Sequence, residues 1–366
     1  MICSQTQSTP GEPIMTVTNR RIVLTSVPAG VPTADDFEVV TETMPALADG
    51  QMLLRTRWLT LDPYMRSGFM ANPDSVGSTV IGGTVSEVIE SRCTGWSEGD
   101  FVVGYCGWQA YSVATADDLQ WNSADMPIQK WDGNLGPAST ALGILGMTGY
   151  TAYEGLLNVA NVKAGETVVV SAASGAVGQV VGQLAKIKGA RAVGIAGGPA
   201  KCAFCTDELG FDACVDYKAG NLPADLAAAA PDGVDIYFEN VGGDVLEAVI
   251  PLLNEGCRVP ICGYISHYNL TEGERRPTPL QRLKAEGLPV LGKDGSTQGF
   301  SFFAFMRLSA SHPEAEDALT DLSNWIKSGK LKYRESVSDG IDACVPAFIG
   351  MMNGENFGKT MIRFDD

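Results

Sequence analysis

The sequence predicts an α/β fold in which a β-rich front precedes a doubly wound parallel sheet. In residues 16–140, alternating strands such as Gln51 to Leu59 are separated by turns rich in Gly, Pro and Asp. From Gly149 onward, short apolar runs alternate with helical patterns, as in a sheet covered by helices on both faces. The 366 residues exceed the size at which a single core usually keeps growing, so we expect two domains.

Four apolar runs in the second part are predicted to be strands of the parallel sheet: Thr167 to Ala173, Arg191 to Ala196, Val234 to Glu239, and Arg258 to Cys262. Continuous apolar runs suit strands that are buried on both faces. A later helix, ended by Gly329, is predicted from apolar residues that share one face: Ala315, Leu319, Leu322 and Ile326. The stretch from Lys332 to Asp366 looks strand-like and irregular again.

The first of these strands runs directly into a glycine-bearing turn and then into a helix. Apolar residues recur there with helical period, at Val177, Val180, Val181, Leu184 and Ile187, and Gly189 ends the helix. Small residues at Ala173, Gly175 and Gly178 would let the backbone approach a pyrophosphate, whose charge the helix N-terminus would meet. Such turns also occur for packing reasons, so the motif alone is weak.

The end of the next strand indicates which dinucleotide would bind. Folds that prefer NAD place Asp or Glu there to hold the ribose 2′-hydroxyl. This chain has no acid in Ala196 to Lys201, which offers glycines and one cation. Lys201 could be an ordinary solvated charge at a helix start, but together with the glycine turn upstream it favours NADP.

Composition and charge exclude several classes of partner. The net charge of −17 disfavours nucleic acid and anionic membranes, since both demand basic surface. No apolar run approaches the roughly 20 residues of a membrane span, and residues 1–14 lack the apolar core of a signal peptide. We therefore expect a cytoplasmic protein whose nine cysteines are reduced thiols.

A metal site is not expected. Cys202 and Cys205 form the only pair at metal or redox spacing, without a second such pair or a nearby His. The two histidines are His267 and His312, so the amino-terminal half offers no His to a catalytic zinc.

Several separated motifs resemble the zinc-independent branch of the medium-chain dehydrogenase/reductases, in the group of leukotriene B4 dehydrogenase, prostaglandin reductase, and alkenal and curcumin reductases. The motifs are Leu61 to Arg66, Gly143 to Tyr153, Ala172 to Lys188, Tyr237 to Gly243, Cys262 to Asn269, and Asn353 to Lys359. The resemblance runs from about Met15 to Phe364. It implies a GroES-like catalytic domain, completed by the last segment of the chain, around a Rossmann domain.

The resemblance also implies boundaries and an assembly. Residues 1–14 are an extra leader, expected to be disordered. Residues 15–147 form the GroES-like catalytic domain, residues 148–328 the Rossmann NADP-binding domain, and residues 329–366 return to the catalytic domain. A homodimer joined through the Rossmann sheets is expected from the family.

The family motifs assign the cofactor contacts of this chain by position. Gly175, Ala176, Val177 and Gly178 would line the pyrophosphate, and Lys201 with Tyr217 resembles the pair that holds the 2′-phosphate. Further NADPH contacts are implied at Asn240, Cys262, Gly263, Tyr264, Ile265, Ser266, His267, Tyr268, Phe300, Ser301, Phe302 and Asn356. The loop Glu286 to Gln298, which precedes Phe300, departs from the family pattern.

The chemistry implied by the resemblance is reduction of the carbon–carbon double bond of an α,β-unsaturated ketone or aldehyde by NADPH. Hydride would reach the β-carbon and leave an enolate oxygen, which a neutral phenol can stabilise without a metal. Tyr64 follows Pro63 in a polar turn, and Tyr268 follows the strand expected at Arg258 to Cys262. From the pattern alone each tyrosine is better explained as a buried phenol bonded to backbone, and the family motifs reverse that preference.

Three other functions stay open at this point. A quinone oxidoreductase of the same superfamily would share the cofactor loop. An allylic-alcohol dehydrogenase would run the opposite redox direction, without the zinc usually used to polarise the oxygen. A non-catalytic NADPH-binding protein would keep the fold without the activity.

Overall fold

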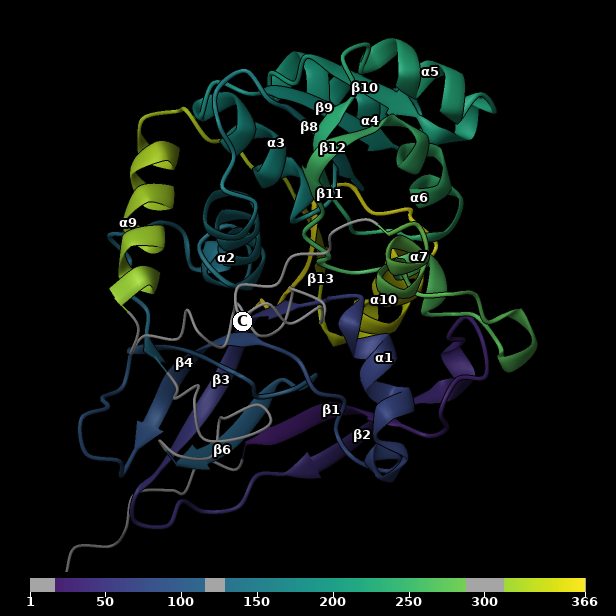
Figure 1. Ribbon diagram of the computed structural model, residues 1–366. Helices are drawn as coiled ribbons and strands as arrows, with labels where there is room; N and C mark the ends of the chain where they lie inside the picture. Colours follow the sequence, from purple (N-terminus) through teal and green to yellow (C-terminus); the bar gives the residue numbers. More distant parts are fainter. Residues whose placement is uncertain (1–16, 116–128, 288–312, 366) are drawn as a thin grey trace, which may run out of the picture.

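The computed structural model describes residues 17–115, 129–287 and 313–365. Figure 1 shows two parts: strands β1, β2, β3, β4 and β6 lie at the bottom of the view, and a sheet flanked by helices lies at the top. The last part of the chain, with β13 and α10, returns to the region between them (Figure 1). The predicted order of a β-rich front and a doubly wound sheet is therefore confirmed.

The upper part is built on a five-stranded parallel sheet with the order β10-β9-β8-β11-β12. Its strands are β8 (Thr167–Ser171), β9 (Arg191–Ala196), β10 (Ala213–Asp216), β11 (Val234–Phe238) and β12 (Leu253–Arg258). The strand predicted at Arg191 to Ala196 has those bounds, and β8 and β11 each begin where predicted. Strand β10, at one edge, was not assigned from the sequence.

The strand predicted at Arg258 to Cys262 is wrong in its bounds, because β12 ends at Arg258. Pro260 has no N–H to donate to a ladder, which disfavours a regular strand across this segment. The chain nevertheless stays beside β11, since the N–H of Glu239 donates to the carbonyl of Pro260 and Ile261 forms an isolated bridge to Glu239. The segment thus stays beside β11 without forming a regular ladder, and it leads from the sheet toward Tyr268.

Helices cover both faces of this sheet. One buried cluster includes Leu184 of α3 (Gly178–Ile187) and Leu322 of α9 (Pro313–Lys327). The opposite cluster includes Leu226 of α5 (Leu222–Ala229), and α6 (Gly243–Val249) and α7 (Pro279–Ala285) also contribute to it. A sheet with both faces covered explains the continuous apolar runs of its strands.

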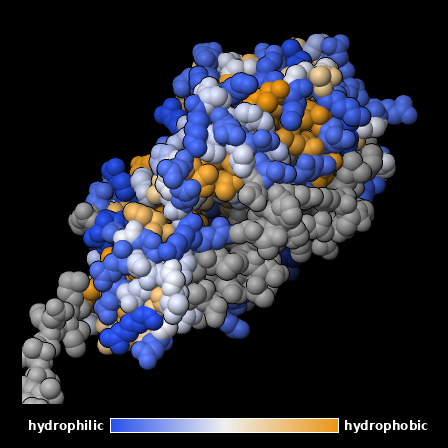
Figure 2. Space-filling view, turned by 90° about the vertical axis from the view of Figure 1, so that its left-hand side faces the viewer, coloured by the Kyte–Doolittle hydropathy of each residue, from blue (hydrophilic) through white to orange (hydrophobic). Residues whose placement is uncertain are grey.

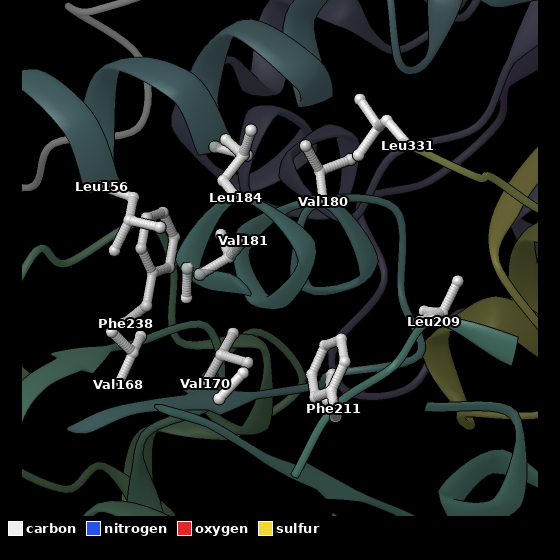
Figure 3. Packing of buried hydrophobic residues seen from close by; sticks show 14 of the residues in the cluster. Leu156, Val168, Val170, Val180, Val181, Leu184, Leu209, Phe211, Phe238 and Leu331 are labelled. Carbon is white, nitrogen blue, oxygen red and sulfur yellow. The ribbon is translucent and has the colours of Figure 1, made fainter. Parts of the chain in front are cut away.

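The predicted apolar face of α3 is confirmed. Val180, Val181 and Leu184 are completely buried. In Figure 3, Val181 lies above Val170 of β8, and Val180 lies beside Leu331, which follows α9. Full burial of such a side chain contributes about 1.5 to 3 kcal/mol. Gly189, at a φ of 78°, ends the helix as predicted, because the N–H of Ala190 donates to Ala185, as in a Schellman cap.

The lower part holds a seven-stranded sheet with the order β13-β14-β3-β4-β5-β7, in which β6 pairs with β3. Its strands are β3 (Gln51–Thr60), β4 (Thr84–Ser91), β5 (Phe101–Gly104), β6 (Tyr111–Thr115), β7 (Gln129–Lys130), β13 (Glu335–Asp339) and β14 (Lys359–Arg363). A separate pair is formed by β1 (Thr18–Leu24) and β2 (Phe37–Thr43). Strand β14 pairs antiparallel with β3, so the end of the chain completes this sheet.

The sequence did not predict two helices in the lower part. Helix α1 (Tyr64–Ala71) follows Pro63, and helix α10 (Cys344–Met352) lies in the stretch expected to be strand-like. Both bury apolar side chains in one cluster, including Met65 and Phe69 from α1 and Phe348 from α10. The short helices α2 (Met147–Tyr153) and α4 (Pro199–Ala203) complete the helices that concern the site.

A buried ion pair joins the returning chain to the segment before α1. Nζ of Lys359, in β14, lies 2.9 Å from Oδ1 of Asp62, and the two side chains are 3% and 4% exposed. The same ammonium donates to the carbonyls of Leu61 and Thr360, and Thr60 donates to Oδ2 of Asp62 at 2.6 Å. Every proton of Lys359 is therefore used within the protein.

The surface carries both hydrophilic and hydrophobic residues. Hydrophilic residues dominate the face seen in Figure 2, and hydrophobic side chains gather there in separate patches. Within the residues that the structure describes, no helix is both long enough and apolar enough to cross a membrane.

We predict that Lys359→Met lowers the free energy of unfolding by about 3 to 5 kcal/mol, because it leaves the carboxylate of Asp62 buried without its counter-charge. Urea denaturation, followed by fluorescence, measures this. The double variant Lys359→Met/Asp62→Leu should recover part of the loss. As a control, Lys186→Met removes the exposed pair with Asp212 and should cost at most about 1 kcal/mol. Equal losses for the two lysine variants would contradict the prediction.

Candidate active site

A cavity of about 690 Å³ lies where the carboxyl ends of β8, β9 and β11 meet the lower part of the molecule. This is the edge of a doubly wound sheet at which ligands bind. Most of the predicted site residues line it: Tyr64, Gly175, Ala176, Val177, Gly178, Lys201, Tyr217, Asn240, Cys262, Gly263, Ile265, Ser266, His267, Tyr268 and Asn356. Residues that lie far apart in the sequence, from Tyr64 to Asn356, are thus brought together.

Two residues that the sequence placed at the ligand site do not line the cavity. A further predicted group of residues lies outside the part of the chain that the structure describes. Tyr264 is absent from the cavity wall and instead packs edge-on against Tyr268, with ring centroids 5.5 Å apart. Ala173, expected to let the backbone approach a ligand, is completely buried against the sheet. Phe300, Ser301 and Phe302 belong to the residues that the structure does not describe.

The glycine turn after β8 is shaped by close packing. A Cβ on Gly178 would lie 2.3 Å from the carbonyl oxygen of Ala172, so the start of α3 can approach the strand only with glycine there. Ala172 itself has a φ of 51°, in the left-handed region that L residues rarely adopt. The chain therefore turns sharply after β8, and Gly175 to Gly178 form part of the cavity wall.

One corner of the cavity combines a lysine, a tyrosine and a glycine. Nζ of Lys201 donates to the carbonyl of Gly354 at 2.8 Å. The ring of Tyr217 lies against Gly197, where a Cβ would come within 2.8 Å of it. Burial, and then the positive charge of Lys218, lowers the pKa of Lys201. An anion placed here would relieve the repulsion between the two ammonium groups.

A buried carboxylate, that of Glu239, stabilises the turn after β11. Oε1 of Glu239 accepts hydrogen bonds from the hydroxyls of Ser171 and Tyr237 and from the N–H groups of Val241 and Gly242. Burial raises the pKa of Glu239, while these donors lower it. The resulting turn presents Val241 and Gly242 to the cavity.

Two asparagines on the cavity wall have fixed orientations. The side chain of Asn240 donates to the carbonyl of Ser171 at 2.8 Å, and that of Asn356 donates to the carbonyl of Gly358 at 3.0 Å. Because each amide nitrogen has a backbone partner, the position of the neighbouring amide oxygen is also set. Both residues therefore act as preorganised polar groups.

Tyr268 is positioned by neighbours on both sides. Burial raises the pKa of its phenol, and the backbone of Tyr264, acting as a donor, partly offsets that rise. The next residue, Asn269, accepts a hydrogen bond from Nε of Arg66 at 3.2 Å. An oxygen that accepts from backbone keeps its own proton available for a further acceptor.

Tyr64 is the first residue of α1, so its expected place in a polar turn is wrong. Pro63, the residue before the helix, has a φ of −59° and so already has helical geometry. Burial raises the pKa of Tyr64 well above its ordinary value, and nearby Tyr105 and Asp62 raise it further. At neutral pH the phenol is therefore a neutral hydrogen-bond donor.

The apolar part of the wall was not identified from the sequence. It includes Met351 and Met352 at the end of α10, together with Leu270 and Met147. Met351 and Met352 were missed because no helix was predicted in the residues that form α10. Methionine side chains are flexible and fill irregular spaces, so this wall suits a bulky apolar ligand.

The cavity fits a phosphorylated dinucleotide. Gly178 and Gly197 line the cavity, and a Cβ on either would collide with Ala172 or with Tyr217. Lys201 and Lys218 supply positive charge beside the strand end that lacks an acid. Such a corner would accept a 2′-phosphate, whereas NAD-binding folds place a carboxylate there.

Two family models match the chain. One, described as the N-terminal domain of oxidoreductase, covers residues 20–121, and the other, described as a zinc-binding dehydrogenase, covers residues 176–304. In residues 17–115, 129–287 and 313–365, no three His, Cys, Asp or Glu side chains are grouped so that they could hold a metal ion.

Curated relatives match over nearly the whole chain. The NADPH-dependent curcumin reductase of Escherichia coli is 43% identical over 350 residues, which are 94% of this chain and 96% of that protein. Prostaglandin reductase 1 of Rattus norvegicus is 39% identical over 341 residues, 91% of this chain and 95% of the relative.

A solved structure has the same architecture. CurA from Vibrio vulnificus, in complex with NADPH, matches with a TM-score of 0.81 and 39% identity over 95% of this chain and 99% of that chain. The fold is accordingly a GroES-like β-rich domain combined with a Rossmann domain. The chain belongs to the zinc-independent medium-chain dehydrogenase/reductases, in the group that contains the curcumin and prostaglandin reductases.

Proposed function

We propose that this protein is an NADPH-dependent reductase of the carbon–carbon double bond of α,β-unsaturated ketones and aldehydes. The observation that carries the proposal is the pair of half-buried tyrosines, Tyr64 and Tyr268, on the wall of the cavity that also holds the glycine turn and Lys201. Relatives at about 40% identity named for curcumin and prostaglandin reduction support the same reaction class.

The cofactor contacts follow from the cavity wall. The glycine turn at Gly175 to Gly178 would hold the pyrophosphate, and Lys201 with Tyr217 would hold the 2′-phosphate. Asn240, Asn356 and the segment Cys262 to Tyr268 would hold the remainder. When bound, NADPH supplies a hydride for the β-carbon of the enone.

The protein's own part in the reaction is to bind and stabilise the substrate oxygen. Charge develops on that oxygen as the β-carbon is reduced, and a preorganised phenol donor lowers the barrier most when it is aimed at this charge. Tyr64, on α1, lines the substrate side of the cavity. Tyr268 orders the nicotinamide ribose and its hydroxyl. The proton for the α-carbon comes from solvent.

The apolar wall indicates the kind of substrate. Met351, Met352 and Leu270 line the same cavity as Tyr64 and offer it an apolar surface. We infer that the enone or alkenal carries an apolar chain or ring, which this wall takes out of water. Quinones, allylic alcohols and simple cofactor binding become outcomes of the tests below.

Location and assembly complete the proposal. Each of the eight described cysteines is a free thiol, which fits the reducing cytoplasm. The homodimer expected from the family is proposed here as well. Neither nucleic acid nor membrane is proposed as a partner of a chain with a net charge of −17.

An isotope experiment tests the reaction itself. With NADPH deuterated at the transferred position and a simple enone, we expect the label on the β-carbon of a saturated ketone, and the carbonyl should remain unreduced. Mass spectrometry and nuclear magnetic resonance of the product measure this. Label on the carbonyl carbon, turnover of quinones alone, or NADPH binding without turnover would each refute the proposed reaction.

A second prediction concerns cofactor choice. A hydrogen bond to a charged group contributes about 1.5 to 3 kcal/mol, so Lys201→Ala should reduce kcat/KM for NADPH by about 10- to 150-fold and leave NADH almost unchanged. Lys186→Ala removes a cation of the same domain that pairs with Asp212, and it should change neither value. Equal losses with both cofactors would argue against a 2′-phosphate site.

A third prediction concerns the phenols. Tyr64→Phe and Tyr268→Phe should each slow turnover, by up to about 10²- to 10³-fold for a full oxyanion donor. Since the pKa of both phenols is raised above the ordinary value of about 10, each stays protonated as pH rises through that value. The rate should therefore show no alkaline loss near pH 10 from these groups. A loss there that both variants abolish would contradict this.

A further inference from the structure

Thr360, in β14, carries a buried hydroxyl that the proposed reaction does not use. The residue is 4% exposed and lines the cavity. Its Oγ1 is shielded from solvent and has no hydrogen-bond partner among the residues that the structure describes. A buried hydroxyl without a partner costs free energy, and most buried polar groups in native proteins are satisfied. A hydrogen-bonding group on a bound ligand would remove this cost.

Thr360 lies on the substrate side of the cavity. Side chains alternate between the two faces of a strand, so Thr360 shares a face of β14 with Ile362. Ile362 belongs to the buried cluster that also contains Met351 and Met352 of α10, and Tyr64 packs against the same cluster. The side chain of Thr360 is therefore on the same side of β14 as the apolar wall and Tyr64.

The backbone of Thr360 is fixed, so its side chain is the part that can adjust. Its carbonyl accepts hydrogen bonds from the N–H of Leu61 at 3.2 Å and from Nζ of Lys359 at 3.3 Å. The next residue, Met361, pairs with Thr60 of β3. Rotation about the Cα–Cβ bond exchanges the hydroxyl with the methyl group and leaves the strand in place. The side chain can therefore turn its hydroxyl toward a ligand.

The surroundings of this hydroxyl indicate which ligand group it would bind. A threonine hydroxyl is neutral and can both donate and accept, so it suits a neutral oxygen group. The neighbouring ammonium of Lys359 has no proton to spare for a carboxylate, because it donates to Leu61, Asp62 and Thr360. The methionines of α10 make the nearby wall apolar. An apolar ligand with one neutral oxygen group matches this combination.

We propose that Thr360 is a specificity-determining residue, whose hydroxyl binds a hydroxyl group on the apolar chain or ring of the substrate, apart from the reacting carbonyl. This inference rests on the proposed function and narrows its substrate class to enones and alkenals with such a second oxygen group. Tyr64 binds the carbonyl oxygen, and Thr360 holds the body of the substrate in one orientation. A substrate without the second oxygen leaves Oγ1 of Thr360 unpartnered.

Two variants, Thr360→Val and the matched control Thr56→Val, test the inference. Valine keeps the shape of threonine and replaces the hydroxyl with a methyl group. Thr56, in β3, is 1% exposed and also has a buried Oγ1 without a partner in the described part of the chain, but it is absent from the cavity wall. Because neither variant removes a hydrogen bond of these hydroxyls within the protein, both should unfold thermally at or above the temperature of the native protein.

Turnover is measured with a straight-chain enone and with analogues that carry one hydroxyl group at successive positions along the chain. In the native protein, we expect the best-placed hydroxyl to raise kcat/KM by about 2- to 10-fold over the parent enone, the range of one neutral hydrogen bond. Thr360→Val should abolish this preference and leave kcat for the parent enone within about 2-fold, whereas Thr56→Val should retain the preference. Affinity for the matching saturated ketones, measured by fluorescence with NADP and without turnover, should follow the same pattern.

The possible failures can be told apart. If no hydroxyl position raises kcat/KM in the native protein, or if Thr360→Val keeps the preference, then Thr360 does not select the substrate. If a folded Thr360→Val protein loses turnover of the parent enone, the hydroxyl acts on the reacting carbonyl or on the cofactor, and the inference is wrong. A native protein that reduces none of these enones would refute the proposed function itself.

Discussion

The buried ion pair between Lys359 and Asp62 is the constraint on which the candidate site depends. Two charges removed from water are tolerated only when each is matched by the other and by further hydrogen bonds. Here the ammonium has three acceptors, and each carboxylate oxygen has a donor. Strand β14 is thereby fixed against the segment that begins α1. Tyr64, two residues after Asp62, has its position set as a result.

The same returning segment also fixes the cofactor side of the cavity. The N–H of Gly358 donates to the carbonyl of Ser174, in the glycine turn, and the carbonyl of Gly354 accepts from Lys201. One short stretch of chain therefore contacts the glycine turn, Lys201 and the carboxylate before Tyr64. A shift of β14 by one residue would reverse the faces of its side chains and disturb all three contacts together.

The sequence predicted those parts of the structure that depend on residues close together in the chain. The glycine turn, strand β9 and the buried face of α3 each follow from residues close together in the chain. Helix α10 was missed because Pro346 and Gly350 interrupt its apolar residues, and its burial is decided by contacts with the first half of the chain. The pairing of Lys359 with Asp62 spans 297 residues. No periodicity within either segment carries such information.

The late position of Lys359 has a consequence for the order of events during synthesis. The five strands of the parallel sheet are all made by Arg258, so that sheet has its strands before the ribosome reaches the end of the chain. The lower sheet lacks β13 and β14 until the last residues emerge. Contacts across such separations carry the largest loop-closure cost and form late. A nascent chain therefore leaves the end of β3, from Trp58 to Thr60, without its partner strand, and its cavity is unfinished.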